Sequence, residues 1–361
     1  MTLNKFLVNA TASGLWAACA LAAFLTLSVS QPANAQLWPW PWGSDTSSNE
    51  TAYKTKALLP ALSGDAKAVT VSGLSAGAYM SIQLHMAFSS SISGVGSIAG
   101  GPWNCAEGSV YQARDACMSD PSKVDVAALL RQLKAAERVG LIDALSNLVN
   151  SRVYLYNSPD DAVILPPMNE KEVSFYSKLI PASQIKSETS VHAAHGMPTL
   201  DFGNSCNLQD SPYLVNCKFD AAGETLKQLY PSLTLGRKAA VKTSLKMFDQ
   251  SAFAGSEALL GQTGWVYVPA TCTNGGCPVH VVLHGCLQTP EHVKTTFVTH
   301  AGYNEWAEGS GIIVLYPQAR KSLMNPNGCF DWFGYTGADY ANKRGPQMRA
   351  IKAMIDRILS N

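Results

Sequence analysis

The sequence carries almost no net charge, because 27 Lys and Arg residues face 26 Asp and Glu residues. The small excess disappears if Lys5 is removed with an N-terminal leader, which leaves 26 residues of each sign. Nucleic-acid affinity comes largely from clustered Lys and Arg that displace counterions, so this balance argues against a nucleic-acid partner. A neutral or water-insoluble substrate fits the composition better.

The sequence also lacks an apolar run long enough for a membrane anchor. The run from Leu15 to Leu27 is followed by Ser, Gln and Pro, and it is short of the about 20 residues that span a bilayer. Lys5 before it and Ala33-Asn34-Ala35 after it are typical of a secretory signal. We therefore expect residues 1–35 to be removed and the mature protein to be secreted or periplasmic. Lipid attachment at Cys19 is the alternative, which the apolar residues continuing beyond it disfavour.

Paired C-x-x-C motifs are absent, which disfavours a structural zinc site. Of nine cysteines, eight lie outside the expected signal, and an even number is typical of an exported, oxidised chain. The close spacings favour three local disulfides, Cys105 with Cys117, Cys206 with Cys217, and Cys272 with Cys277. Cys286 and Cys329 are then left to pair across the fold. We expect no metal and no cofactor.

The chain shows no internal repeat and no Thr-rich or Gly/Ser-rich linker near its C-terminus. Residues 36–60 contain Trp38-Pro39-Trp40-Pro41-Trp42 followed by small polar residues, which is typical of a tether. We expect residues 61–361 to form a single catalytic domain, since their number suits one large α/β domain. We expect this protein to be a monomer.

Short β-branched runs alternate with helical segments, which indicates an α/β fold whose mostly parallel sheet is covered by helices on both faces. The expected strands are Lys67–Ser72, Gly94–Ile98, Arg152–Tyr156, Gly264–Val268, Val279–Leu283 and Ile312–Tyr316. The expected helices are Ala76–Phe88, two within Val124–Val149 that Gly140 divides, and Pro346–Leu359.

The motif G-x-S-x-G occurs at Gly73-Leu74-Ser75-Ala76-Gly77, between an expected strand and an expected helix. That setting is typical of a sharp turn that exposes a nucleophilic serine and leaves the amide of Ala76 free to bind an oxyanion. The alternative is an ordinary glycine-rich turn with an exposed serine. We predict Ser75 as the nucleophile.

A serine nucleophile needs a histidine base and an acid that orients it, in the chain order Ser, acid, His. His195, in a loop of small residues, is the candidate base, and His192 is its nearest competitor. The acid is expected just after the strand Arg152–Tyr156, where Asp160 and Asp161 are indistinguishable by chemistry alone. A capping or turn-forming role is the alternative for both aspartates.

A second oxyanion donor normally comes from an HG-type loop that precedes the serine. The matching segment here, His284-Gly285-Cys286 after an apolar strand, lies far downstream of Ser75. We therefore predict a circularly permuted fold, in which rejoined chain ends leave the sheet unchanged. A buried structural His284 is the alternative.

These blocks together resemble the polyhydroxyalkanoate depolymerases of the α/β-hydrolase fold, in their permuted single-domain branch, over almost all of the expected mature chain. The segments that carry the resemblance are 73–80, 99–105, 153–163, 195–204, 283–288, 315–318 and 327–332.

The resemblance implies roles for individual residues. It aligns Asp161 with the orienting acid and His195 with the base of Ser75. It also implies that the amides of Ala76 and Cys286 bind the oxyanion, and that a disulfide between Cys286 and Cys329 holds the loop that contains Cys286. Trp332 becomes a candidate for the wall of the substrate crevice, and a core tryptophan under the loop is the alternative.

The implied partner is a polyester such as poly(3-hydroxybutyrate), or its hydroxyalkanoate oligomers. Many members of the family carry a separate domain that adsorbs to crystalline polymer. We expect no such domain in this chain, so amorphous polymer or soluble oligomer is the expected substrate. A small-ester or carbohydrate esterase of acetyl or feruloyl type is the competing enzyme hypothesis, because fold does not fix substrate. A non-catalytic polyester-binding protein is the competing hypothesis from another class.

Overall fold

The computed structural model describes residues 53–361. The expected signal at residues 1–35 and the expected tether up to residue 52 lie outside the described residues. Residues 53–60 were also expected in the tether, but they pack on the folded body: Leu59 is fully buried, and Tyr53 contacts the Trp265 ring edge to face at 5.9 Å.

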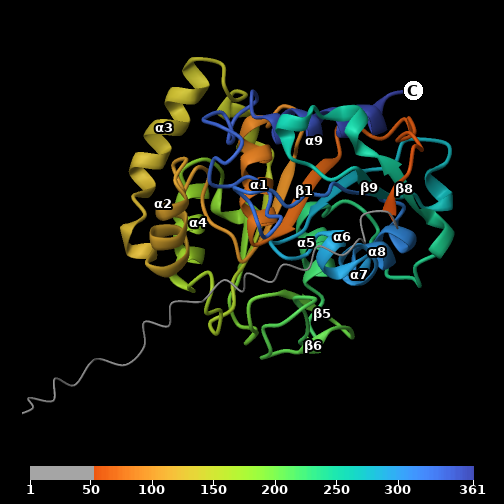
Figure 1. The fold of residues 1–361 in the computed structure, drawn as a ribbon, viewed down its shortest axis with the longest axis horizontal. Coiled ribbons are helices and arrows are strands. Elements are labelled where there is room, and N and C mark those ends of the chain that lie inside the picture. The colour runs from red at the N-terminus through yellow and green to blue at the C-terminus, as the bar shows by residue number, and fades with distance from the viewer. Residues whose placement is uncertain (1–52) are drawn as a thin grey trace, which may run out of the picture. The chain divides into compact units, whose positions relative to one another are not determined.

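An eight-stranded, mostly parallel sheet forms the centre of the molecule (Figure 1). Its strand order is β4-β3-β2-β1-β10-β11-β9-β8, and β9 runs antiparallel to both of its neighbours. The strands are β1 (Val69–Leu74), β2 (Gly94–Ile98), β3 (Arg152–Tyr156), β4 (Ile185–Glu188), β8 (Leu245–Asp249), β9 (Thr263–Tyr267), β10 (Val279–Leu283) and β11 (Ile313–Tyr316). The central strands are buried along their whole length, as expected of a parallel sheet covered on both faces.

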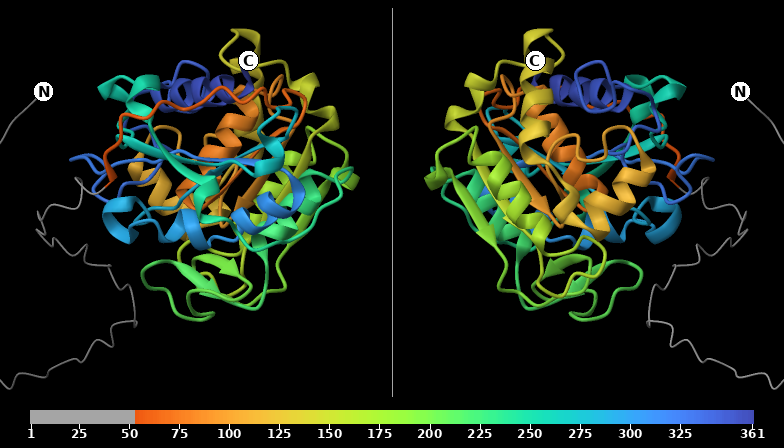
Figure 2. Two further views of the ribbon diagram at one scale, coloured as in Figure 1. Left: turned by 90° about the vertical axis from the view of Figure 1, so that its right-hand side faces the viewer. Right: turned by 90° about the vertical axis from the view of Figure 1, so that its left-hand side faces the viewer.

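Helices cover both faces of the sheet, as the sequence predicted (Figure 2). They are α1 (Ala76–Ala87), α2 (Val110–Arg114), α3 (Val126–Arg138), α4 (Pro167–Tyr176), α5 (Ala221–Leu229), α6 (Pro290–Val293), α7 (Thr296–His300), α8 (Tyr303–Ser310) and α9 (Pro346–Leu359). Consecutive residues of β2 separate the two faces: Ser97 donates a hydrogen bond to Glu172 of α4, whereas a Cβ at Gly96 would lie 2.5 Å from Thr225 of α5. Glycine at position 96 therefore lets α5 approach the sheet closely.

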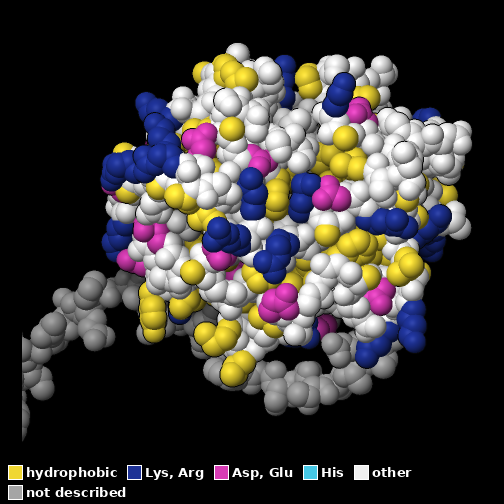
Figure 3. Space-filling model, turned by 90° about the horizontal axis from the view of Figure 1, so that it is seen from above, with side chains coloured by type: hydrophobic (Ala, Val, Ile, Leu, Met, Phe, Trp, Pro, Cys, Tyr) yellow, Lys and Arg dark blue, Asp and Glu magenta, His cyan; other side chains and the backbone are white. Residues whose placement is uncertain are grey.

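A small second sheet lies below the main sheet in the view of Figure 1. Its strands, in the order β5-β7-β6, are β5 (Met197–Thr199), β7 (Leu214–Asn216) and β6 (Asn204–Ser205), and they pair in parallel. On the opposite side of the molecule, Lys and Arg side chains are interspersed with Asp and Glu side chains (Figure 3).

The strand before Ser75, β1, and the strand before the His284-Gly285-Cys286 loop, β10, are neighbours although they lie far apart in the sequence. Gly73 of β1 pairs with Leu283 of β10. The beginning and end of the folded body also meet, because Ser63 N–H donates to Ser360 O at 2.9 Å. Both features are expected of a circular permutation, in which the original chain ends are joined and the chain is opened at another point while the order of strands in the sheet stays the same.

Four disulfides join the eight cysteines, and all four pairings agree with the expected ones: Cys105–Cys117, Cys206–Cys217, Cys272–Cys277 and Cys286–Cys329. Among residues 53–361, no helix is both long and apolar enough to cross a bilayer. The same residues contain no cluster of three or more His, Cys, Asp or Glu side chains arranged to hold a metal ion.

Candidate active site

Ser75 lies in the sharp turn between β1 and α1. Its backbone has φ 55° and ψ −120°, a strained conformation for a residue with a side chain. Ser75 N–H donates to Ile98 O at 2.9 Å, and Ser75 O accepts from the first turn of α1. These bonds hold the turn, so the strain is fixed by the surrounding structure.

The two glycines of the motif are required by close backbone contacts. A Cβ at Gly73 would lie 2.3 Å from the carbonyl carbon of Gly77, and a Cβ at Gly77 would lie 2.2 Å from Leu283 O. No larger residue fits at either position without moving the backbone of β1, α1 or β10. The pattern G-x-S-x-G therefore reports the packing of this turn on the neighbouring strand.

Asp161 and His195 form a buried pair beyond the end of β3. His195 Nδ1 lies 2.8 Å from Asp161 Oδ2, and the two side chains are 10% and 2% exposed. Asp161 Oδ1 accepts hydrogen bonds from Val163 N–H and Ile164 N–H. An ionised carboxylate only accepts, so Nδ1 carries the proton and the lone pair of a neutral His195 is at Nε2.

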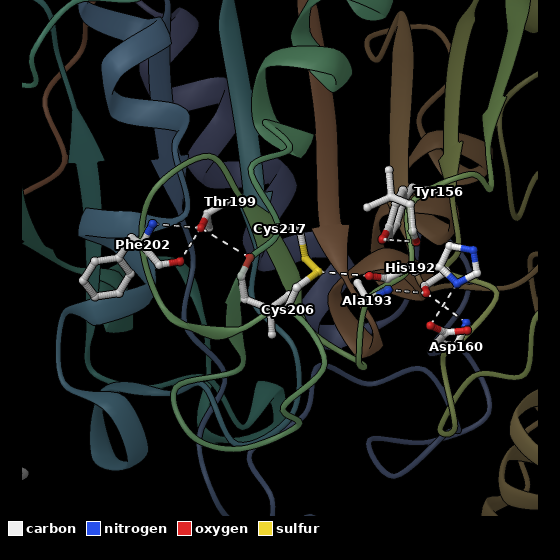
Figure 4. Close-up of a disulfide and its surroundings, with 11 residues drawn as sticks. Tyr156, Asp160, His192, Ala193, Thr199, Phe202, Cys206 and Cys217 are labelled. Atoms are coloured by element: carbon white, nitrogen blue, oxygen red, sulfur yellow. Dashed lines mark hydrogen bonds and ion pairs between the residues drawn. A yellow bond between two sulfur atoms is a disulfide. The ribbon is translucent and has the colours of Figure 1, made fainter.

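Asp160 and His192 form a second pair beside the first, on the surface. His192 Nδ1 lies 2.9 Å from Asp160 Oδ2, with side chains 70% and 56% exposed. Figure 4 shows the His192 ring turned toward Asp160. Burial thus distinguishes the two aspartates from each other and the two histidines from each other: Asp161 and His195 are shielded from solvent, whereas Asp160 and His192 are not.

The loop before His195 is held to its surroundings through the backbone. Ala193 N–H donates to Ser158 Oγ at 2.8 Å, and Ala194 N–H donates to Cys206 O at 2.8 Å. The Cys206–Cys217 disulfide lies beside this loop, with Cys206 Sγ 3.0 Å from His192 O (Figure 4). The main chain that presents His195 is therefore anchored to both the Asp161 loop and the small sheet.

The loop after β10 lies directly against Ser75. A Cβ at Gly285 would contact the Cβ of Ser75 at 3.4 Å. His284 is fully buried, and burial lowers its pKa to about 4, so the ring is neutral. Its Nδ1 lies 2.7 Å from Gly285 O, and its Nε2 accepts from Ala319 N–H at 3.2 Å.

This geometry orients the Cys286 amide. A carbonyl oxygen only accepts, so Nδ1 of His284 is the donor to Gly285 O. The peptide between Gly285 and Cys286 is trans, and in a trans peptide the C=O and N–H point in opposite directions. Fixing Gly285 O against His284 therefore turns Cys286 N–H away from that ring. The Cys286–Cys329 disulfide and the bond from Leu287 N–H to Asn327 O hold the remainder of the loop.

Trp332 stacks on Tyr79 of α1, with ring centroids 4.4 Å apart, and it is 7% exposed. Its indole N–H is buried, and it has no hydrogen-bond partner among residues 53–361. Tyr79 lies one turn after Ser75, and its pKa is raised well above the usual value by burial and then by the charges of Glu172 and Asp161. The indole therefore packs near the nucleophile turn with an unused donor.

Of the residues that the sequence predicted for catalysis, the structure pairs Asp161 with His195 and sets the Gly285–Cys286 peptide against Ser75. Ser75 follows β1, Cys286 follows the adjacent strand β10, and Asp161 with His195 follows β3, which is two strands, or about 10 Å, from β1. Within residues 53–361, neither Ser75 Oγ nor His195 Nε2 has a hydrogen-bond partner. Sequence reasoning missed the contact by which His284 orients the Gly285–Cys286 peptide, because a histidine in the sequence does not signal such a contact.

No protein-family model matches the chain. It is 41% identical over 307 residues to a poly(3-hydroxybutyrate) depolymerase of Delftia acidovorans, covering 84% of this chain and 62% of that protein. It is 34% identical over 322 residues to a polyhydroxybutyrate depolymerase of Talaromyces funiculosus, covering 84% of this chain and 92% of that protein. The chain thus spans less than two thirds of the Delftia relative and nearly all of the Talaromyces one.

Two solved structures are similar to the fold over 84% of this chain and 99% of each of theirs, at 33% identity and a TM-score of 0.77. One is a PHB depolymerase from Penicillium funiculosum, and the other is a serine-to-alanine variant of a PHB depolymerase complexed with an R3HB trimer. On this similarity in sequence and in structure, the chain belongs to the polyhydroxybutyrate depolymerase family, with its permuted α/β-hydrolase fold.

Proposed function

We propose that the protein is a serine esterase that hydrolyses the ester bonds of poly(3-hydroxybutyrate)-type polyesters or their oligomers. The observation that carries the proposal is the strained Ser75 turn against the Gly285–Cys286 peptide, in a chain whose relatives are polyhydroxybutyrate depolymerases. A depolymerase of the same fold complexed with an R3HB trimer supports an oligoester of 3-hydroxybutyrate as the bound form of the substrate.

In the proposed reaction, Ser75 Oγ attacks the ester carbonyl carbon and His195 Nε2 takes the hydroxyl proton. Asp161 holds Nδ1–H and stabilises the imidazolium that forms. The carbonyl oxygen becomes an oxyanion between the amides of Ala76 and Cys286. Ala76 N–H is the first amide of α1 and has no acceptor one turn earlier in the helix. Each such donor contributes about 3 kcal/mol to catalysis.

The tetrahedral intermediate collapses when the C–O bond to the alcohol breaks and His195 returns the proton to that alcohol. Water, deprotonated by the same imidazole, then attacks the acyl carbon, the bond from that carbon to Ser75 Oγ breaks, and His195 returns the proton to Ser75 as the acid leaves. The Ser75 hydroxyl and His195 Nε2 must come within hydrogen-bond distance for the first step, and such bonds tighten when substrate binds. We further propose that Trp332, with its unused N–H beside Tyr79, lines the site that receives the polyester.

We also infer that the protein is exported. Four disulfides form in oxidising compartments and are rare in the cytosol, so they support a secreted or periplasmic location. The mixed, nearly neutral charge of the chain suits an uncharged polyester.

The test compares the unmutated protein with Ser75→Ala on amorphous polyhydroxybutyrate, on a 3-hydroxybutyrate dimer ester, and on an acetylated or feruloylated glycan. We expect release of hydroxybutyrate units by the unmutated protein and none by the variant, with little change in melting temperature. Turnover confined to the glycan would contradict the polyester assignment. Granule binding without any ester turnover would contradict the enzyme assignment.

A further inference from the structure

Gln288 follows the Gly285–Cys286 peptide by two residues and is 1% exposed. Its side-chain amide is fully used. Oε1 accepts from Gly285 N–H at 2.7 Å, and Nε2 donates to Pro212 O at 3.0 Å and to Tyr213 O at 3.2 Å. One side chain therefore joins the oxyanion loop to a segment about 75 residues earlier in the chain.

That segment belongs to the small sheet that presents the base. Tyr213 O also accepts from Met197 N–H at 2.9 Å, and β5 pairs with β7 from Met197 and Leu214 onward. Met197 lies two residues after His195. The path from Gly285 to His195 therefore runs through one amide side chain, one shared carbonyl and two residues of backbone.

Gly285 is held at both ends by side chains. His284 Nδ1–H donates to its carbonyl oxygen, and Gln288 Oε1 accepts from its N–H. With both ends of the residue fixed, the peptide that carries Cys286 N–H has little freedom to rotate. Because Gln288 Nε2 also bonds the small sheet, the position of that amide is tied to the position of His195.

We propose that Gln288 is a positioning residue that sets the oxyanion amide of Cys286 and the His195 loop at a fixed separation across Ser75. The inference rests on the proposed function. Without the amide, both loops remain attached to their own strands but lose the bond that connects them. The cost should appear in the transition state, where the oxyanion and the imidazolium must be stabilised together.

The chain offers a matched control in Gln250, which is fully buried and uses its amide in the same pattern. Its Nε2 donates to two carbonyls, Gly261 O and Gln318 O, and its Oε1 accepts Gln318 N–H at 3.1 Å. None of these partners belongs to the proposed catalytic residues or to the 285–286 peptide. Substituting either glutamine therefore removes a buried, hydrogen-bonded amide, but only the substitution of Gln288 removes the connection to the His195 loop.

The experiment compares Gln288→Met and Gln250→Met with the unmutated protein, using a p-nitrophenyl ester and the 3-hydroxybutyrate dimer ester. Methionine keeps the length of the side chain and removes its donor and acceptor. We expect both variants to lose a similar amount of thermal stability. We expect kcat of Gln288→Met to fall by about 10- to 100-fold with KM changed less than about threefold, a loss below that for removing an oxyanion donor outright. Gln250→Met should stay within about threefold of the unmutated protein in both constants.

A boronic acid that adds to Ser75 mimics the tetrahedral intermediate and gives a second readout. Its affinity should fall in Gln288→Met by the same factor as kcat/KM and remain unchanged in Gln250→Met. If Gln288→Met fails to fold, Gln288→Glu replaces it, because a carboxylate keeps the acceptor for Gly285 N–H but replaces the two bonds to the small sheet by repulsion from the carbonyl oxygens of Pro212 and Tyr213. We expect at least a tenfold loss of kcat in that variant at neutral pH.

An active unmutated protein whose Gln288 variants match Gln250→Met in kcat and in boronate affinity would overturn the inference alone. An unmutated protein that hydrolyses neither ester would overturn the proposed function, and the inference with it.

Discussion

At the scale of single residues, the adjacent Asp160 and Asp161 show how burial assigns different roles to the same side chain. Asp161 is 4% exposed as a residue, accepts two backbone N–H groups and holds His195. Asp160 faces solvent, where its pair with His192 is screened and contributes at most about 1 kcal/mol. The proposed mechanism needs only the buried pair.

We predict that Asp161→Asn lowers kcat by about 10⁴-fold, because an amide at this position no longer fixes the tautomer of the base. Asp160→Asn, its matched control one residue away, should change kcat less than about threefold. Steady-state kinetics on a p-nitrophenyl ester, with a melting curve for each variant, measures both effects. A larger loss in Asp160→Asn than in Asp161→Asn would reverse the assignment of the acid.

Glu172 of α4 is a fully buried carboxyl that packs against β2. Burial raises its pKa to about 8, against a smaller opposing effect of the hydrogen bond from Ser97 Oγ at 2.6 Å. Its second oxygen has no partner among the described residues. The folded protein therefore keeps this carboxyl protonated near neutral pH, whereas the unfolded chain ionises it above about 4.5.

This difference in proton binding makes stability depend on pH. Between pH 4.5 and 8 the folded state holds a proton that the unfolded state has lost, so Glu172 lowers the free energy of unfolding as pH rises, by at most about 1.4 kcal/mol per pH unit. We predict that Glu172→Gln removes this slope. The stability of the variant relative to the unmutated protein should therefore increase from pH 5 to pH 8 in urea unfolding.

The comparison is internally controlled. His85, His280 and His284 contribute the opposite slope, because burial lowers their pKa values to about 3, 3 and 4, and the unfolded chain gains protons on them below about pH 6.5. Those groups are the same in both proteins and cancel in the difference. A difference that stays constant with pH would show that Glu172 is ionised in the folded protein.

At the scale of elements, the loop after β10 depends on a long-range covalent link. The Cys286–Cys329 disulfide spans 43 residues, whereas Cys272–Cys277 spans 5. A crosslink restricts the unfolded chain more when it closes a longer loop, which corresponds to about 4 kcal/mol for the first disulfide and about 2 kcal/mol for the second.

We predict that replacing Cys286 and Cys329 together by Ala costs more stability than replacing Cys272 and Cys277 together. The first double variant should also lose kcat, because the oxyanion loop is released from the segment around Cys329, while the second should keep it. Urea unfolding and ester kinetics on both double variants measure the two effects. Equal losses of stability with unchanged kcat in both would contradict this account of the loop.

At the scale of the whole molecule, the permuted order of the chain has a direct physical consequence. The start of the folded body bonds to the last helix, since Leu62 N–H donates to Ile358 O at 3.1 Å. The segment between α5 and β8 includes an exposed run, Lys238–Thr243. Because the sheet depends on strand order in space, the chain ends can be moved to this run without changing the core.

We predict that a re-permuted chain folds and retains ester hydrolysis. Its design begins at Ala240, continues to Asn361, passes through about 15 Gly and Ser residues to Tyr53, and ends at Ala239. Leu62 lies beside the last helix, and the nine residues from Tyr53 to Leu62 extend at most about 32 Å, so a linker of this length can join Asn361 to Tyr53. Cooperative unfolding with kcat within about tenfold of the original chain is expected. An insoluble or inactive product would show that the exposed run is needed to connect α5 and β8.

Local patterns in the sequence predicted much of this fold because they describe local physics. The bounds of β2, β3, β10 and α9 agree with the expected ones, since these segments are apolar runs or amphipathic periods with clear ends. The edge strands β4 and β8 were missed. Ile185–Glu188 and Leu245–Asp249 are short and carry charged residues, so they are strands because β3 and β9 pair with them.

The sequence by itself determined the nucleophile motif, the disulfide partners and the permuted α/β class, because spacing, parity and alternation are properties of the chain. The family resemblance selected Asp161 over Asp160 and His195 over His192, but only the tertiary structure showed that burial distinguishes them, and only it placed Gln288 between the oxyanion loop and the small sheet. Those distinctions depend on which atoms are removed from water and on which backbone groups meet across long stretches of chain. Burial and long-range contact are decided by packing, which a run of residue types does not record.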